Sequence, residues 1–202
     1  MTYAAKGLAA LEAQLQQDLE FLELPAKPWV PERSYQSERV RDVVVIGAGM
    51  CGLAALAKLQ FTGISNVVAY DAAPAGLEGP WITFARMETL RSPKTLHGPA
   101  LGLAQLTFRA WFTAQWGNEA WQELDKIPKA QWMDYLVWYR RVLNLPVPKP
   151  AVYTPAVWCW PPGVQGSAVL PCRNSCKALT AGSGRTPPMT SILQRYRANA
   201  LR

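Results

Sequence analysis

The chain has 202 residues, of which 50% are hydrophobic and 17% are charged, so its composition excludes a disordered polypeptide and suffices for one domain with a core. The net charge of +7 is concentrated near the C-terminus: all 14 acidic residues lie at or before Asp134, whereas residues 151–202 hold six Lys or Arg. The rest of the chain is therefore nearly neutral, and we expect no nucleic-acid partner.

No signal peptide or membrane span is expected. The N-terminus lacks a basic region followed by an apolar core, and the longest nearly apolar run, residues 43–57, is only 15 residues long and is interrupted by glycine. Four cysteines in a chain of this length do not indicate a secreted disulfide scaffold. We expect a cytoplasmic protein that does not bind membranes, and the sequence leaves the oligomeric state open.

An amphipathic helix is predicted over residues 7–24. Five leucines recur there at helical spacing: Leu8, Leu11, Leu15, Leu19 and Leu22. The helix is expected to end before Pro25, and residues 27–32 (KPWVPE) to form an extended linker. Because its polar face is rich in Gln, Glu and Asp, the helix is expected to lie on the domain surface rather than on an anionic membrane. Residues 1–40 are thus predicted to be a helical arm and linker.

Residues 41–71 predict a strand, a glycine turn, a helix and a second strand that ends on an acid. Val43–Ile46 is a run of β-branched residues, which is typical of a strand buried on both faces. A helix is expected from Leu53 to about Gln60, and a second strand over Asn66–Tyr70. This order of elements is that of a dinucleotide-binding βαβ unit.

The glycines of this unit have the spacing G-x-G-x-x-G. Gly47 permits the tight turn, Gly49 lets the backbone approach a pyrophosphate, and Gly52 lets the helix pack close to the strand. The helix then directs its free N–H groups and positive dipole end at the phosphates. Asp71, 24 positions after Gly47, is placed to accept hydrogen bonds from a ribose. A carboxylate there repels a 2′-phosphate, so NADP is disfavoured at this turn, while NAD and FAD both fit.

The segment after the acid, residues 71–81 (DAAPAGLEGPW), favours FAD. It resembles the glycine-and-tryptophan segment of flavin-dependent monooxygenases, in which glycines allow the backbone to approach the flavin side of the cofactor. The match is imperfect, because that family often has adjacent glycines, whereas Leu77 and Glu78 separate Gly76 from Gly79 here.

Residues 82–107 have no regular pattern and are rich in Pro and Gly, which is typical of a long loop over a site. The loop carries Arg91, Lys94 and the chain's one histidine, His97. We interpret His97 as an exposed loop residue rather than a proton shuttle. No metal-ligand spacing occurs before residue 151, so no metal site is expected.

Residues 108–145 are rich in aromatic side chains and predict two helices. One helical face carries Phe108, Trp111, Phe112 and Gln115, and a second stripe carries Trp132, Tyr135, Leu136, Tyr139 and Leu143. Most of these side chains are expected to form a core, while a few wall a flavin or substrate pocket. Arg140 and Arg141 suit the negative end of the second helix dipole.

The C-terminal segment, residues 149–202, changes in character. It has no acidic residue, it holds three of the four cysteines, and it lacks strand or helix periodicity before its last dozen residues. Cys159, Cys172 and Cys176 lack a fourth ligand for zinc. We interpret this irregular tail as the product of a reading-frame change or truncation.

Four segments together resemble the N-terminal part of a bacterial FAD-dependent oxidoreductase related to flavin-containing and N-hydroxylating monooxygenases. They are GAGMCG, GLEGPW, TLRSPKTLHGP and the run from LTFRAWF to LNLPV, all within residues 1–148. The resemblance implies an α/β fold: a Rossmann-like FAD-binding βαβ unit, here residues 41–148, with an N-terminal helix and added aromatic-rich helices. In such enzymes NADPH, bound at a second glycine fingerprint, reduces the flavin, which then uses O₂ to oxygenate a small-molecule substrate.

The resemblance also implies roles for individual residues. Gly47, Gly49 and Gly52 would hold the FAD pyrophosphate, and Asp71 the adenosine ribose. Gly79 and Trp81 would lie near the flavin, and Arg91 and Lys94 would line the cofactor or substrate side. It names no catalytic acid or base.

The chain departs from the family in having one glycine fingerprint. Residues 182–188 (GSGRTPP) are no second one, because the prolines prevent a helix from starting there. No NADPH site is therefore visible. The main hypothesis is the FAD-binding portion of a flavin-dependent oxidoreductase or monooxygenase. The alternatives are a non-catalytic, truncated FAD-binding fragment and a single-site NAD-dependent oxidoreductase.

Overall fold

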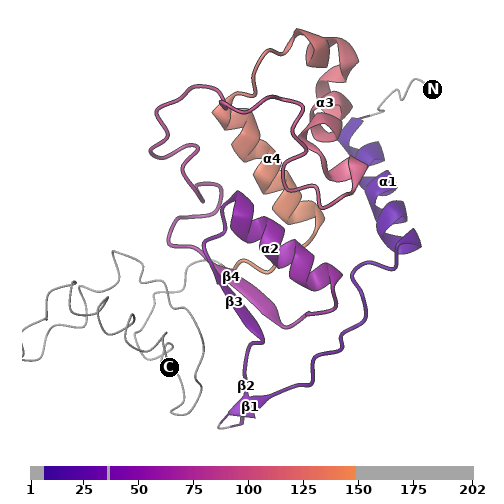
Figure 1. The fold of residues 1–202 in the computed structure, drawn as a ribbon, viewed down its shortest axis with the longest axis vertical. Helices are drawn as coiled ribbons and strands as arrows, with labels where there is room; N and C mark the ends of the chain where they lie inside the picture. Colours follow the sequence, from indigo (N-terminus) through magenta and orange to yellow (C-terminus); the bar gives the residue numbers. More distant parts are fainter. Residues whose placement is uncertain (1–6, 36, 149–202) are drawn as a thin grey trace, which may run out of the picture. The chain divides into compact units, whose positions relative to one another are not determined.

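A computed structural model describes residues 7–35 and 37–148 (Figure 1). The expectations for residues 149–202, including those for Cys159, Cys172 and Cys176, lie outside the described residues. The same holds for residues 182–188.

A βαβ unit forms where the glycine fingerprint predicts it. Strand β3 (Val43–Ile46) pairs in parallel with β4 (Val67–Tyr70), and helix α2 (Met50–Phe61) connects them. The register places Val43 opposite Val67 and Ile46 opposite Tyr70. The α/β, Rossmann-like fold is thereby confirmed. Helix α2 begins three residues before the predicted start, because Gly49 is already its extended N-cap residue.

The prediction that β3 is buried on both faces is wrong. Val43 and Val45 pack against the core on the side of α2. On the opposite face Val44 is 40% exposed and Ile46 59% exposed. The β-branched pattern reports strand propensity, but burial needs a second layer, and none of the described residues supplies it here.

The free edge of β4 contacts the segment that follows helix α4 (Lys129–Val142). The Ala69 amide donates a hydrogen bond to the Pro146 carbonyl at 3.0 Å. Leu145 and Val147, on either side of Pro146, are both buried. Strand β4 is therefore flanked by β3 on one side and by residues 145–147 on the other, and it is more buried than β3.

The N-terminal helix α1 (Gly7–Phe21) packs against the helical part of the chain. Leu11, Leu15 and Leu19 are its buried residues, and its contacts are with the 3₁₀ turn η1 (Ala104–Leu106) and helix α3 (Phe108–Glu123). The helix ends at Phe21, earlier than predicted. Glu23 adopts a positive φ of 51°, and the Leu24 amide bonds to the Leu19 carbonyl at 2.8 Å. This C-terminal cap ends the helix, so Leu22 falls outside the buried row of leucines and is 56% exposed.

The linker after α1 contains a small hairpin that the sequence did not predict. Strand β1 (Ser34–Tyr35) pairs antiparallel with β2 (Glu38–Arg39). The segment over residues 82–107 is irregular apart from η1, as predicted.

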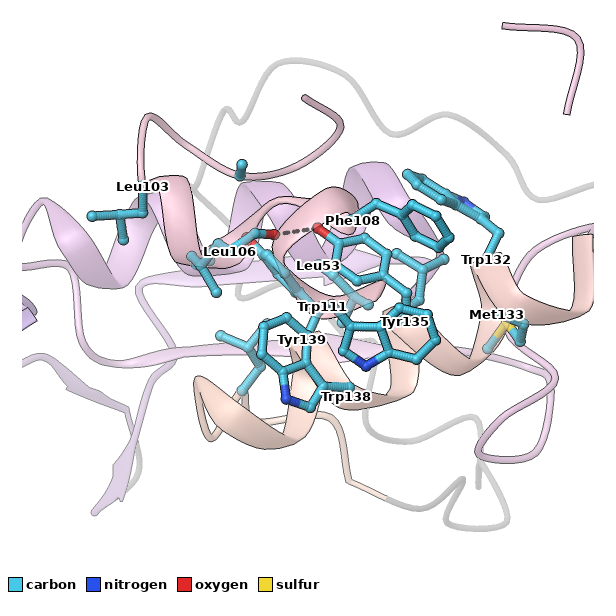
Figure 2. Close-up of a cluster of buried hydrophobic side chains, with 14 of the residues drawn as sticks. Leu53, Leu103, Leu106, Phe108, Trp111, Trp132, Met133, Tyr135, Trp138 and Tyr139 are labelled. Carbon is cyan, nitrogen blue, oxygen red and sulfur yellow. Dashed lines mark hydrogen bonds between the residues drawn. The ribbon is translucent and has the colours of Figure 1, made fainter. Parts of the chain in front are cut away.

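The aromatic side chains form a core between α3 and α4 (Lys129–Val142), as the stripes predicted (Figure 2). Phe108 lies at the centre of this core. The centroids of five aromatic rings lie 5.4–6.3 Å from the centroid of its ring: Trp111, Phe112, Trp121, Trp132 and Tyr135. The buried Tyr135 hydroxyl donates to the Leu106 carbonyl at 2.6 Å, the bond dashed in Figure 2. Gln115, predicted on the same face as Phe108, is exposed.

Candidate cofactor site

The glycine turn connects the end of β3 to the start of α2. The Gly47 amide donates to the Tyr70 carbonyl at 2.7 Å, which fastens the turn to the end of β4. Gly49 is the N-cap of α2 and provides no side-chain cap. The first backbone bond of the helix runs from the Leu53 amide to the Gly49 carbonyl at 2.9 Å. The amides ahead of Leu53 have no intrahelical partner, and they form a positive end suited to an anion.

Gly52 is required by packing between the helix and the turn. A Cβ atom at this position would lie 1.8 Å from the Gly47 carbonyl oxygen. No real side chain tolerates that distance, so only glycine lets α2 begin this close to β3. The geometry accounts for the role that the fingerprint gives to its third glycine.

Gly49 faces a second glycine that is distant in sequence. A Cβ atom at Gly49 would lie 3.6 Å from the Gly79 Cα atom, and one at Gly79 would lie 3.7 Å from the Gly49 Cα atom. The fold therefore brings the glycine turn and the segment at residues 76–81 into backbone contact. A group bound at the start of α2 would meet both backbones with no side chain between them.

Trp81 follows Gly79 and carries an unsatisfied donor. Its Nε1 atom would lie 3.5 Å from a Cβ atom at Gly79, and it is buried with no hydrogen-bond partner among the described residues. The ring packs edge-to-face on Trp132, with 6.1 Å between centroids. A buried N–H without an acceptor costs about 1–3 kcal/mol, which a ligand oxygen would recover. This orphaned donor beside two facing glycines fits a bound dinucleotide.

Asp71 holds the glycine turn by its own carboxylate. One oxygen, Oδ2, accepts from the Ala48 amide at 2.6 Å, and Oδ1 accepts from the Ala73 amide at 2.8 Å. The acid thus lies beside the turn, as the fingerprint predicts, but it also has a structural role that the sequence did not reveal. Each carboxylate oxygen has two acceptor sites, so a ribose hydroxyl can still bind.

A buried ion pair that sequence reasoning missed lies beside the turn. Arg140 of α4 donates to Glu78 at 2.7 Å, and Glu78 is only 4% exposed. These two residues and Ala48 line a pocket of about 380 Å³ between the turn, residues 75–78 and the C-terminal half of α4. A signal existed in the sequence, because Arg140 lies four residues after the buried Leu136 and therefore on the inner side of the helix.

The loop over residues 82–107 carries Arg91, Lys94 and His97 away from the glycine turn. The Lys94 ammonium donates to the Trp121 carbonyl at 2.7 Å and to the Leu124 carbonyl at 2.5 Å, and it lies 5.0 Å from the centre of the Trp121 ring. These contacts cap the C-terminal end of α3. Arg91 and His97 are exposed. The structure does not bring these three side chains to the glycine turn, and the cofactor roles of Arg91 and Lys94 stay predictions.

Neither a metal-binding cluster nor a membrane-spanning helix occurs in residues 7–35 and 37–148. Within those residues no three His, Cys, Asp or Glu side chains are grouped so that they could hold a metal ion. None of the helices there has the length and apolar character needed to cross a membrane.

Comparison with known proteins finds a related sequence. The chain is 51% identical over 141 residues to the FAD-dependent urate hydroxylase of Xanthomonas campestris pv. campestris. The aligned stretch covers 70% of this chain and 30% of that protein, so the chain spans about a third of its relative's length. No family model matches the chain. No solved structure matches it either. The similarity confirms the predicted resemblance to a bacterial FAD-dependent oxidoreductase.

Proposed function

We propose, from this resemblance to a bacterial FAD-dependent oxidoreductase, that the chain binds FAD as the FAD-binding part of a flavin-dependent hydroxylase or monooxygenase. We assign the binding to residues 41–148. One observation carries the proposal: Gly49, at the uncapped start of α2, faces the backbone of Gly79. A dinucleotide pyrophosphate needs such a side-chain-free approach to a helix N-terminus.

Each part of the site suits one part of FAD. The free amides at the start of α2, next to Gly49, would bind the pyrophosphate, and the carboxylate of Asp71 would accept a ribose hydroxyl. Gly79 and Trp81 would lie on the flavin side, where the flavin would accept a hydrogen bond from the unpaired indole N–H of Trp81. Bound FAD would supply the redox and oxygen chemistry, while these residues orient it.

Two features favour FAD over NAD at this turn. Asp71 suits either cofactor, since both carry a free adenosine ribose. We call the glycine turn together with Gly79 and Trp81 the cofactor cradle. This cradle extends beyond the pyrophosphate, because Gly79 contacts Gly49 and Trp81 has an unpaired donor. A longer cradle suits the larger cofactor.

We further propose NADPH as the reductant and a small molecule as the substrate. Urate is the first compound to test, because the name of the similar Xanthomonas protein states it. The carboxylate of Asp71 opposes a 2′-phosphate, so the proposed NADPH would bind elsewhere than at the glycine turn.

FAD titration of the purified chain tests the proposal. We expect saturable binding by the wild type and at least a 100-fold loss in Gly49→Val, because the added methyl groups occupy the gap toward Gly79. Ala55→Val, on the exposed side of the same helix, is the matched control and should bind FAD normally. NAD, titrated in parallel, should bind weakly. Unchanged FAD affinity in folded Gly49→Val protein would show that this turn does not hold the phosphates.

A further inference from the structure

The loop that carries Gly79 is fastened by the carboxylate before it. Glu78 is 4% exposed, and both of its oxygens are used. Oε1 accepts from Arg140 at 2.7 Å, and Oε2 accepts from the Gly76 amide at 2.6 Å. The second bond closes the loop on itself between its two glycines.

Arg140 connects this loop to two other parts of the chain. Its Nη1 atom binds Glu78, and its Nη2 atom donates to the Val147 carbonyl. Val147 follows Pro146, which accepts from Ala69 in β4. One planar guanidinium therefore joins the loop, helix α4 and the segment that flanks the sheet. Such a fork fixes direction as well as distance.

Stability alone does not account for this pair. Removing two charges from water is costly, and apolar residues of similar volume are often as stabilising or more so. The pair does supply a fixed geometry. Glu78 immediately precedes Gly79, whose Cα atom lies against the glycine turn. The loop between Gly76 and Trp81 has no helix or strand to hold it in place.

We propose that Glu78 and Arg140 are positioning residues that hold Gly79 against the glycine turn, so that the cofactor cradle is formed before the cofactor arrives. This inference rests on the proposed binding of FAD. Without the pair, the loop is free to leave the turn, and binding must order it at the expense of affinity.

A neighbouring ion pair on the same helix provides a matched control. Arg141 binds Glu12 of α1 at 2.5 Å, with side chains that are 59% and 26% exposed. The Glu12 carboxylate also accepts from the Trp138 indole at 3.0 Å. This pair ties α4 to α1, and its hydrogen bonds do not involve the loop at residues 76–81. Its loss should affect folding stability without changing the cradle.

The experiment compares Glu78→Gln, Glu12→Gln and the double variant Glu78→Gln/Arg140→Gln. FAD affinity and the visible circular dichroism of the bound flavin are measured at a temperature where far-ultraviolet spectra show each protein folded. We expect Glu78→Gln to bind FAD about 10- to 100-fold more weakly, as when an outer-shell partner of a bound group is removed. Its flavin dichroism should change. Glu12→Gln should bind within about twofold of the wild type.

The double variant separates positioning from stability. It removes the charge that Glu78→Gln leaves without a carboxylate partner on the partly buried Arg140, so it should regain stability while FAD binding stays weak. Affinity that recovers together with stability would overturn the inference, as would wild-type affinity in Glu78→Gln. If the wild type itself binds no FAD, the proposed function fails instead.

Discussion

The aromatic core and the glycine turn differ in the polar groups that they leave unpaired. In the core the Tyr135 hydroxyl binds the Leu106 carbonyl, and the Trp138 indole binds Glu12. At the turn the first amides of α2 lack a side-chain cap, and the Trp81 indole lacks an acceptor among the described residues. The core is not fully satisfied either, because the Trp132 indole and the Tyr139 hydroxyl are buried without a partner among the described residues, but its rings pack on one another and serve stability. The turn has donors left over, which is what a ligand site needs.

The largest expected effect is a loss of folding stability when one ring is removed from the aromatic core. Phe108→Ala should lower the free energy of unfolding by about 3–5 kcal/mol, because the ring fills the space between five others. Urea unfolding measures it, with Phe84→Ala as the control. Phe84 is 76% exposed, and its loss should cost less than about 0.5 kcal/mol. A similar cost for both variants would show that the core is not packed as described.

A smaller effect tests whether polar groups in the core are satisfied. Tyr135→Phe should cost about 1–3 kcal/mol, because it leaves the Leu106 carbonyl without its buried donor. The matched variant is Tyr139→Phe. The Tyr139 hydroxyl is buried with no partner in the described part of the chain, so its removal should be neutral or slightly stabilising.

Both tyrosines are suitable for this test at ordinary pH. Burial raises the pKa of Tyr135 and the pKa of Tyr139 well above the usual range, so both hydroxyls remain protonated. Thermal or urea unfolding of the two variants gives the comparison. Equal costs at both positions would contradict the contrast between a bonded and an unbonded hydroxyl.

The smallest effect concerns the tie between α1 and α4. The hydrogen bond from Arg141 holds the pKa of Glu12 below its ordinary value of 4.5. A lowered pKa means that the folded state favours the ionised form, so this stability is present above pH 4.5 and is lost as the pH falls through the lower, folded value. Glu12→Gln should therefore cost up to about 1 kcal/mol at pH 7, because the pair is partly exposed.

The pH dependence provides the check on that last prediction. The difference in unfolding free energy between the wild type and Glu12→Gln should shrink progressively below pH 4.5. A difference that stays constant down to pH 3 would assign the effect to packing rather than to the ion pair.

Much of the fold could be predicted from the sequence because its signals are local. The β-branched run, the glycine spacing and the acid after the second strand define β3, α2 and β4 to within a few residues. The burial of β3 was predicted wrongly. Strand propensity depends on the residue itself, whereas the exposure of Val44 and Ile46 depends on what else covers the sheet.

The site was less predictable because its contacts join distant segments. Glu78 and Arg140 are 62 residues apart, and no local pattern pairs them. Lys94 illustrates the same limit. Its charge and its loop suggested a cofactor role, but the path of the loop delivers it to the carbonyls at the end of α3. Which partner a charge meets depends on tertiary structure.

Hydrogen exchange with and without FAD tests the central claim most directly, because it reads both regions in one experiment. The account predicts that FAD slows exchange at residues 47–53 and 75–81, where free amides and the facing glycines lie. Exchange over residues 108–116 and 132–139 in the aromatic core should stay the same. Protection confined to the core, or none at the turn under saturating FAD, would contradict it.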